Sequence, residues 1–283
     1  MKKDADWDDV IKLWEYGKPV STLEKYRPVI AHFRNFVEQT PLHKIELRHL
    51  QTYMDLWKKL KPASVHWKMS AICSLLKFAH RLGVIAVNPS TMLRLPKVPD
   101  DLAKRIFPVA EIQKLIAAEP DNRKKVMISL IYCTGIRTSE CSGLRWTDCR
   151  ERGKFGQITV LGKGSKKRSI KINPDIWKML CEMRPPYARD CDPVFLSPDG
   201  VRPIHRTRIS HIVADAARRM GLEHRICAHA LRHCHATHAM DAGAPLPLIS
   251  ATLGHASIQT TARYLHANPD KSSGEFIKLR PAG

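Results

Sequence analysis

The residues best suited to chemistry are a tyrosine near the C-terminal end and the basic residues that precede it. Tyr264 closes a segment that starts at Thr252 and contains His255, and the cluster His229-Ala-Leu-Arg232-His233 stands upstream. A free tyrosine hydroxyl has a pKa of about 10 and is a poor nucleophile, so arginines and histidines would have to activate it against a phosphate. This combination of residue types points to cleavage of a DNA strand by a tyrosine.

The net charge agrees with a polyanionic partner. Lys and Arg number 47 against 27 Asp and Glu, which gives a formal net charge of +20. Each phosphate that a basic protein neutralises releases condensed counterions and adds salt-dependent affinity. A basic solvated surface would carry the same charge, so the composition favours a nucleic-acid partner without establishing one.

A second candidate for phosphate binding lies further upstream, in Thr134-Gly-Ile-Arg137-Thr-Ser-Glu140. The pattern predicts a turn before a helix, with Arg137 in the first turn and Glu140 one turn later. An arginine offers a planar fork of donors to two phosphate oxygens, and a carboxylate three residues away can fix its orientation. Taken alone, the pair would equally suit a surface salt bridge.

The cluster around Arg232 allows two interpretations. On a helix over 230–240, His229 and Arg232 lie three residues apart and face the same way. His229 and His233, four residues apart, could instead begin a zinc site. No acidic or thiolate third ligand stands at a fitting offset, and Arg232 between them would repel a dication, so we expect no metal.

Two domains and a linker are expected to position these residues. Residues 1–93 predict a helical domain, and residues 107–283 predict a domain that mixes helices with a β-hairpin, so the fold class is mainly α with a small sheet. Prolines between them predict an extended linker over 94–106. The linker carries four weak candidates for contacts with a DNA backbone: Arg94, Lys97, Lys104 and Arg105.

Local patterns predict the individual elements. Ser21 and Glu24 form a capping-box pattern that predicts a helix start, and apolar stripes predict two further helices, one from Leu47 and one after Pro62. In the second domain, strands over 157–161 and 168–172 flank a glycine-bounded turn and predict a hairpin. Helices are expected over the tyrosine segment and over 112–118, 126–132, 175–183, 208–220 and 230–240.

Cysteine spacing and hydropathy limit the cellular setting. The eight cysteines form no Cys-x-x-Cys pair, and no window is apolar for long enough to cross a bilayer. We therefore expect reduced thiols, no membrane contact and a cytoplasmic location, associated with the nucleoid if the source is bacterial.

Five patterns taken together resemble the tyrosine recombinases, the phage integrase family. They are Thr-Gly-Ile-Arg137-x-x-Glu140 with Leu144-x-Trp146-x-Asp148, Gly-Lys163-Gly in the hairpin turn, His229-x-Leu-Arg232-His233, Leu-Gly-His255, and Thr-Thr-x-x-Tyr264. They stand in the family's order, and the resemblance in motif covers about residues 107–266. The helical N-terminal part resembles the family's core-binding domain in layout only.

The resemblance implies a role for each matching residue. Arg137 and Arg232 would hold the scissile phosphate, and Tyr264 would attack it to form a 3′-phosphotyrosyl link. Lys163 would protonate the leaving 5′ oxygen, although Lys166 and Lys167 in the same turn could compete with it and otherwise rank as weak DNA contacts. His229 would be the general base.

The remaining matches are supporting ones. His255 would donate a hydrogen bond to the phosphate, Glu140 would orient Arg137 or His229, and His233 would support this group. Because the phosphotyrosine conserves the energy of the broken bond, the resemblance implies that neither ATP nor metal is needed and that there is no cofactor.

The resemblance also implies the partners. They are double-stranded DNA with core-type inverted repeats, a homotetramer that exchanges strands through a four-way junction, and possible accessory DNA-bending or directionality proteins, as for a mobile element. The apolar trio Phe276, Ile277 and Leu279 suggests a tail that docks on a neighbouring protomer. A type IB topoisomerase and a non-catalytic DNA-binding regulator stay open as alternatives.

Overall fold

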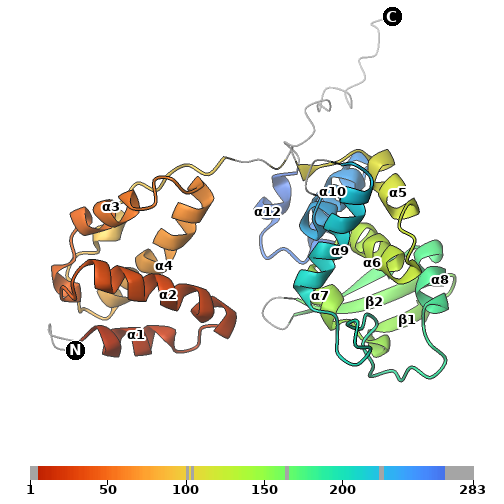
Figure 1. Ribbon diagram of the computed structural model, residues 1–283, viewed down its shortest axis with the longest axis horizontal. Coiled ribbons are helices and arrows are strands. Elements are labelled where there is room, and N and C mark those ends of the chain that lie inside the picture. Colours follow the sequence, from red (N-terminus) through yellow and green to blue (C-terminus); the bar gives the residue numbers. More distant parts are fainter. Residues whose placement is uncertain (1–5, 100–101, 103–104, 163–165, 223–225, 265–283) are drawn as a thin grey trace, which may run out of the picture. The chain divides into compact units, whose positions relative to one another are not determined.

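The computed structural model describes residues 6–99, 102, 105–162, 166–222 and 226–264. The chain forms two compact units, Met1–Pro99 and Asp100–Gly283 (Figure 1). Each unit encloses its own apolar core. Among the described residues, no helix is both long and apolar enough to cross a membrane.

The first unit is helical, as its apolar stripes predict. Its core gathers aromatic rings, for example Phe33 and Tyr53, whose ring centroids lie 5.0 Å apart. Its helices are α1 (Trp7–Glu15), α2 (Val20–Phe36), α3 (Leu47–Asp55) and α4 (Pro62–Arg81), with short 3-10 turns η1 (Leu42–Lys44) and η2 (Pro89–Thr91).

Two details of this unit differ from expectation. The capping box is wrong: α2 starts at Val20 behind Pro19, and no side chain caps it. Proline has its φ fixed near the value that a helix entry accepts, so it can start the helix without the serine. Helix α1 was not expected, although Trp7, Val10 and Trp14 are buried at spacings of three and four.

The second unit packs helices around a three-stranded antiparallel sheet of order β1-β2-β3 (Figure 1). The expected hairpin is present, with Leu161 of β2 opposite Lys167 of β3. Strand β1 (Cys149–Arg152) was not expected, because its residues are mostly exposed and polar. The other strands are β2 (Phe155–Leu161) and β3 (Lys167–Ile172).

The helices expected over 112–118, 126–132, 175–183, 208–220 and 230–240 are present and begin and end within a few residues of these limits. The helix expected over the tyrosine segment covers only Ile258–Ala262 and ends before Tyr264, and the helix Leu246–Leu253 was not expected. Polar side chains set several of the starts: Asp121 caps α6, and Asn173 caps α8. The helices are α5 (Val109–Ala117), α6 (Asn122–Thr134), α7 (Thr138–Gly143), α8 (Pro174–Glu182), α9 (Arg206–Arg219), α10 (Ala228–Asp241), α11 (Leu246–Leu253) and α12 (Ile258–Ala262), with the 3-10 turn η4 (Trp146–Asp148).

Helix α10 is the central element behind the candidate site. It packs against α6, α9 and α11, and α11 in turn packs against β3. Gly135 ends α6 with φ of 62°, and Gly254 ends α11 with φ of 65°. Both glycines adopt the left-handed conformation that favours glycine, and both expose a backbone carbonyl near the arginines described below. The mainly helical fold with a small sheet is thus confirmed.

Candidate active site

Arg232 is the most deeply buried arginine among the second unit's described residues. It lies on α10 with 2% of its surface exposed. One guanidinium nitrogen donates to the carbonyl of Gly135, and the other donates to the carbonyl of Leu253 at 2.7 Å. Burial lowers the pKa of Arg232 to about 10, and the charge of Arg137 acts in the same direction. The group therefore stays positive at neutral pH.

Arg137 is held by Glu140, the carboxylate expected to orient it. The backbone N–H of Arg137 donates to one carboxylate oxygen at 2.8 Å, and its guanidinium donates to the other at 2.9 Å. Arg168 of β3 donates to both oxygens of the same carboxylate, each at 2.8 Å. Burial would raise the pKa of Glu140, but the hydrogen bonds from Arg168 and Arg137 outweigh it and lower that pKa. The hydrogen-bond donors to Glu140 among the described residues are thus arginines, not His229.

The C-terminal end of α11 connects the three arginines. The last carbonyls of a helix have no partner within it and carry the negative end of the helix dipole, so they attract cationic donors. Here three consecutive carbonyls accept from three different guanidiniums. The pairs are Arg168 with Thr252 at 2.7 Å, Arg232 with Leu253 at 2.7 Å and Arg137 with Gly254 at 3.4 Å.

Tyr264 lies beside His233 of α10, and His233 in turn contacts His229. Its hydroxyl is 2.8 Å from Nδ1 of His233, and the rings of His233 and His229 meet edge to face with centroids 4.3 Å apart. Burial raises the pKa of Tyr264, although Arg232 and Arg263 act against the rise. Burial lowers the pKa of His233 to about 3, with His229 as the next cause. The hydroxyl therefore keeps its proton at neutral pH, beside a neutral imidazole.

His229 and His255 complete the histidine side of the site. Burial lowers the pKa of His229, and Arg232, Arg105 and Arg137 act in the same direction. Burial and the arginines lower the pKa of His255 to about 4, and its Nδ1 lies 2.7 Å from the hydroxyl of Thr261. Arg105, expected as a linker contact, thus lies close enough to His229 to act on its charge.

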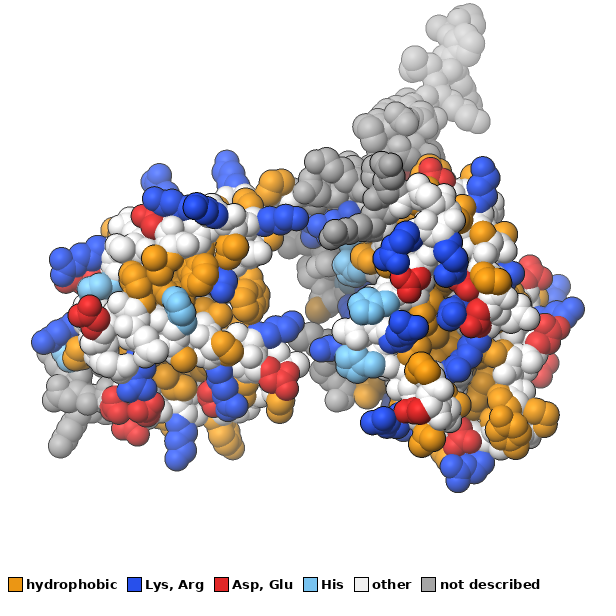
Figure 2. All heavy atoms as spheres, viewed as in Figure 1, with side chains coloured by type: hydrophobic (Ala, Val, Ile, Leu, Met, Phe, Trp, Pro, Cys, Tyr) orange, Lys and Arg blue, Asp and Glu red, His pale blue; other side chains and the backbone are white. Residues whose placement is uncertain are grey.

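A cavity of about 260 Å³ opens onto Arg137, His229 and Arg232. Two residues that the sequence did not single out, Arg206 and Ser210 of α9, also line it. Figure 2 shows histidine side chains gathered on the face of this unit where α9 lies in Figure 1, with Lys and Arg side chains around them. The cavity is therefore lined by arginine, serine and histidine side chains, which can donate hydrogen bonds to the oxygens of a phosphate.

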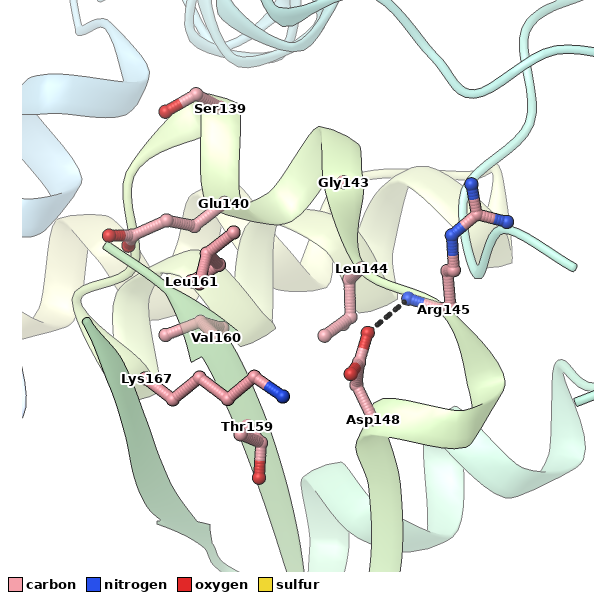
Figure 3. A pocket seen from close by; sticks show the side chains of 10 residues that line it. All are labelled: Ser139, Glu140, Gly143, Leu144, Arg145, Asp148, Thr159, Val160, Leu161 and Lys167. Carbon is pink, nitrogen blue, oxygen red and sulfur yellow. Dashed lines mark hydrogen bonds between the residues drawn. The ribbon is translucent and has the colours of Figure 1, made fainter. Parts of the chain in front are cut away.

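Several expected residues lie elsewhere or outside the described residues. Lys163, Lys104 and the tail trio 276, 277 and 279 fall outside the described residues. In Figure 3 the Lys167 side chain extends beneath α7 toward Asp148 and away from Glu140. The remaining weak candidates are exposed: Arg94, Lys97 and Lys166. Within the described ranges, no group of three His, Cys, Asp or Glu residues is arranged to hold a metal ion.

Arg168 is the main residue that the sequence reasoning missed. The strand alternates exposed and buried positions, and Arg168 shares its face with the buried Ile170 and Ile172. An arginine on the buried face of a strand needs a carboxylate or carbonyl partner, so the alternation was the available signal. Its partners, Glu140 and the Thr252 carbonyl, come from distant parts of the chain.

Comparisons with known proteins identify the family of this chain. A model of the phage integrase family matches residues 105–271. The tyrosine recombinase XerC of Natranaerobius thermophilus is 30% identical over 281 residues, which cover 92% of this chain and 92% of that protein. XerC of Staphylococcus epidermidis is 29% identical over 273 residues, which cover 92% of this chain and 91% of that protein.

Solved structures of recombinases on DNA share the fold. A lambda integrase dimer bound to a core site has a TM-score of 0.73 at 18% identity, with 97% of each chain covered. XerH bound to its difH substrate has a TM-score of 0.71 at 19% identity, with 92% of this chain and 82% of that chain covered. Neither set of relatives favours the topoisomerase or regulator alternatives. The chain belongs to the phage integrase family and is a tyrosine-type site-specific DNA recombinase.

Proposed function

We propose that this recombinase cuts each strand by attack of the Tyr264 hydroxyl on a scissile phosphate held between Arg137 and Arg232. The observation that carries the proposal is the convergence of Arg137, Arg232 and His229 on one cavity, with the Tyr264 hydroxyl bound to the histidine next to His229. The two guanidiniums compensate the charge that accumulates on the non-bridging oxygens as the phosphorus becomes pentacoordinate.

Strand cleavage replaces the phosphodiester bond of the DNA with a phosphate ester to the protein. The Tyr264 oxygen bonds to phosphorus, the bond from phosphorus to the 5′ oxygen breaks, and a 3′-phosphotyrosyl link forms. The tyrosine proton passes to a base, and the leaving 5′ oxygen takes a proton from Lys163. The reverse step, with the 5′ hydroxyl of another strand, rejoins the DNA. No external energy source enters this cycle.

The two histidines have different roles. His229 stands at the cavity and serves as the general base that takes the tyrosine proton, and the contact with Nδ1 of His233 holds the Tyr264 hydroxyl in place. Burial is the first cause that lowers the pKa of both histidines, so both are neutral at pH 7. The pKa of His233 falls to about 3, which makes it too weak a base for this proton and leaves the role to His229. His255 donates to the phosphate.

The wider assembly belongs to the same proposal. Residues 1–93 bind DNA, the basic linker 94–106 follows the backbone, and residues 107–283 form the catalytic domain. Two duplexes with core-type inverted repeats and four protomers pass through a four-way junction, in the cytoplasm. Solved relatives include a lambda integrase tetramer on a Holliday junction, which supports this stoichiometry.

A covalent trapping experiment tests the proposal. Nicked suicide substrates from a library of DNA that flanks the gene are incubated with the protein in EDTA, and a denaturing gel separates covalent protein–DNA species. We expect an adduct with the wild type and none with Tyr264→Phe. Tyr187→Phe is the matched control, because Tyr187 lies in the same unit and is 87% exposed. An adduct that persists in Tyr264→Phe would refute the assigned nucleophile.

A further inference from the structure

Arg168 stands at a junction of the catalytic unit without facing the cavity described above. It is the second residue of β3, and its side chain is 13% exposed. Its two Nη atoms donate hydrogen bonds to the Glu140 carboxylate, and its Nε donates to the Thr252 carbonyl. All three contacts are 2.7–2.8 Å, which is the range of good charge-assisted hydrogen bonds.

The charges around Glu140 are unequal. One carboxylate, 2% exposed in its side chain, meets two guanidiniums, so this trio keeps one net positive charge. Arg137 is the more exposed of the two, at 35%, and it lines the cavity, whereas Arg168 does not. Arg168, the less exposed of the two arginines, thus donates hydrogen bonds to both oxygens of the Glu140 carboxylate.

We infer that Arg168 is a positioning residue for strand cleavage: it neutralises the buried Glu140 carboxylate and so leaves the charge of Arg137 available to the scissile phosphate. This inference rests on the proposed role of Arg137. It goes beyond the family motifs, because Arg168 belongs to none of the patterns on which the resemblance was based.

The physical reason lies in the cost of a buried unpaired carboxylate. A buried charge that loses its partner is strongly destabilised unless another partner replaces it. Without Arg168, Arg137 would be the nearest remaining cation, since it already donates to Glu140 at 2.9 Å. The carboxylate would then neutralise Arg137 and hold it away from the phosphate.

Arg168 also fixes the helix end that carries the other two arginines. Its Nε bond to Thr252 stands beside the carbonyls of Leu253 and Gly254, which accept from Arg232 and Arg137. In Figure 3 the Glu140 side chain reaches from α7 toward the end of β2 at Leu161, the place where the hairpin turn begins. Arg168 therefore links the hairpin, α7 and α11 through one side chain.

The first test compares four proteins in single-turnover adduct formation on a nicked suicide substrate: wild type, Arg168→Ala, Arg168→Lys and Glu140→Gln/Arg168→Ala. We expect Arg168→Ala to be slower by about 10²-fold, the effect of losing one electrostatic donor. Arg168→Lys should be intermediate, because an ammonium keeps the charge but not the fork. The double variant should recover at least about 10-fold over Arg168→Ala, since no buried charge is left to capture Arg137.

The second test changes the substrate. A methylphosphonate at the scissile position carries no negative charge, so it needs less compensation from Arg137. On this substrate, Arg168→Ala should differ from the wild type by less than about 10-fold. A merely structural role would slow both substrates equally.

A matched control separates chemistry from folding. Arg219 binds Glu119, which is 1% exposed, so Arg219→Ala also removes the partner of a buried carboxylate. We expect Arg219→Ala to lose thermal stability as Arg168→Ala does, with an unchanged rate of adduct formation.

The outcomes are distinct. If the wild type forms no Tyr264-dependent adduct, the proposed function fails and Arg168 is not in question. If the wild type reacts but Arg168→Ala is equally fast, or the double variant is no faster than Arg168→Ala, the inference about Arg168 is overturned while the proposed function stands.

Discussion

The two sides of the candidate active site are held in different ways. On the arginine side, three guanidiniums reach consecutive carbonyls at the end of α11, and Arg232 adds the carbonyl of Gly135. On the tyrosine side, the hydroxyl of Tyr264 contacts Nδ1 of His233, and its ring lies in a small cluster with Leu253 and Ile249. Backbone acceptors set the first side, and side-chain packing sets the second.

The difference follows from what the arginines and the tyrosine each do in the proposed reaction. A phosphate clamp must have its charges aimed before the substrate arrives, and carbonyls fixed by helices supply that aim without reorganisation. A nucleophile must change its protonation and move onto phosphorus, so a lighter attachment suits it. Disturbing the arginine side should therefore cost more than disturbing the tyrosine side's surroundings.

Removing Arg232 should have the largest effect. Arg232→Ala deletes two carbonyl bonds and the most buried of the phosphate charges, so we expect adduct formation to fall by about 10³-fold, the upper range for one electrostatic donor. The measurement is the single-turnover rate at saturating DNA. Arg189→Ala, at an exposed ion pair with Asp192, is the control and should keep the wild-type rate. A loss below about 10-fold would mean that Arg137 alone holds the phosphate.

The sequence predicted most of the participants on both sides. Helices were expected over 208–220 and 230–240, where α9 and α10 lie, and the motif residues Arg137, Arg232 and Tyr264 lie in the one unit that the motifs cover. These signals are local: a stripe, a cap or a short spacing can be read within about ten residues.

The partners could not be predicted in the same way. Arg168 and the Thr252 carbonyl are 84 positions apart, and Arg232 and the Gly135 carbonyl are 97 apart. A carbonyl acceptor has no sequence signature, because every residue carries one. The contact between Tyr264 and His233, where His229 was expected as the base, depends on how α12 returns to α10. Such choices follow from tertiary packing.

Gly254 offers an intermediate perturbation of the arginine side. Its φ is 65°, and a Cβ there would lie 2.9 Å from Nη1 of Arg168. Gly254→Ala should lower the free energy of unfolding by about 1–2 kcal/mol from backbone strain and, by displacing Arg168, slow adduct formation by about 10-fold. Gly200→Ala is the control, since Gly200 has φ of 73° with nothing within 4 Å.

Denaturant unfolding and single-turnover cleavage of both glycine variants separate the effect of backbone strain from the effect of displacing Arg168. Gly200→Ala should show the strain alone, with cleavage unchanged. Equal cleavage rates in the two variants would show that Arg168 tolerates displacement. The contacts of the three arginines with the last carbonyls of α11 would then serve stability and not cleavage.

The smallest effect should come from the tyrosine side, as a dependence of stability on pH. Burial lowers the pKa of His233 to about 3, whereas an unfolded histidine titrates near 6.5. The unfolded chain therefore binds more protons between these values. The stability that neutral His233 contributes is fully present above about pH 6.5 and is lost as the pH falls toward 3.

Replacing His233 should remove that part of the acid sensitivity. Between pH 7 and 5, the wild type should lose about 1 kcal/mol more unfolding free energy than His233→Gln loses, measured by urea unfolding at each pH. His66→Gln, on the exposed side of α4, should follow the wild type. If His233→Gln loses as much as the wild type, His233 has the same pKa in the folded and unfolded chains, and its burial has no electrostatic cost. If His233→Gln loses more than the wild type, the imidazole beside Tyr264 is already protonated in the folded protein at pH 7. The tyrosine side would then resemble the arginine side in presenting a fixed positive charge, and the contrast between the two would disappear.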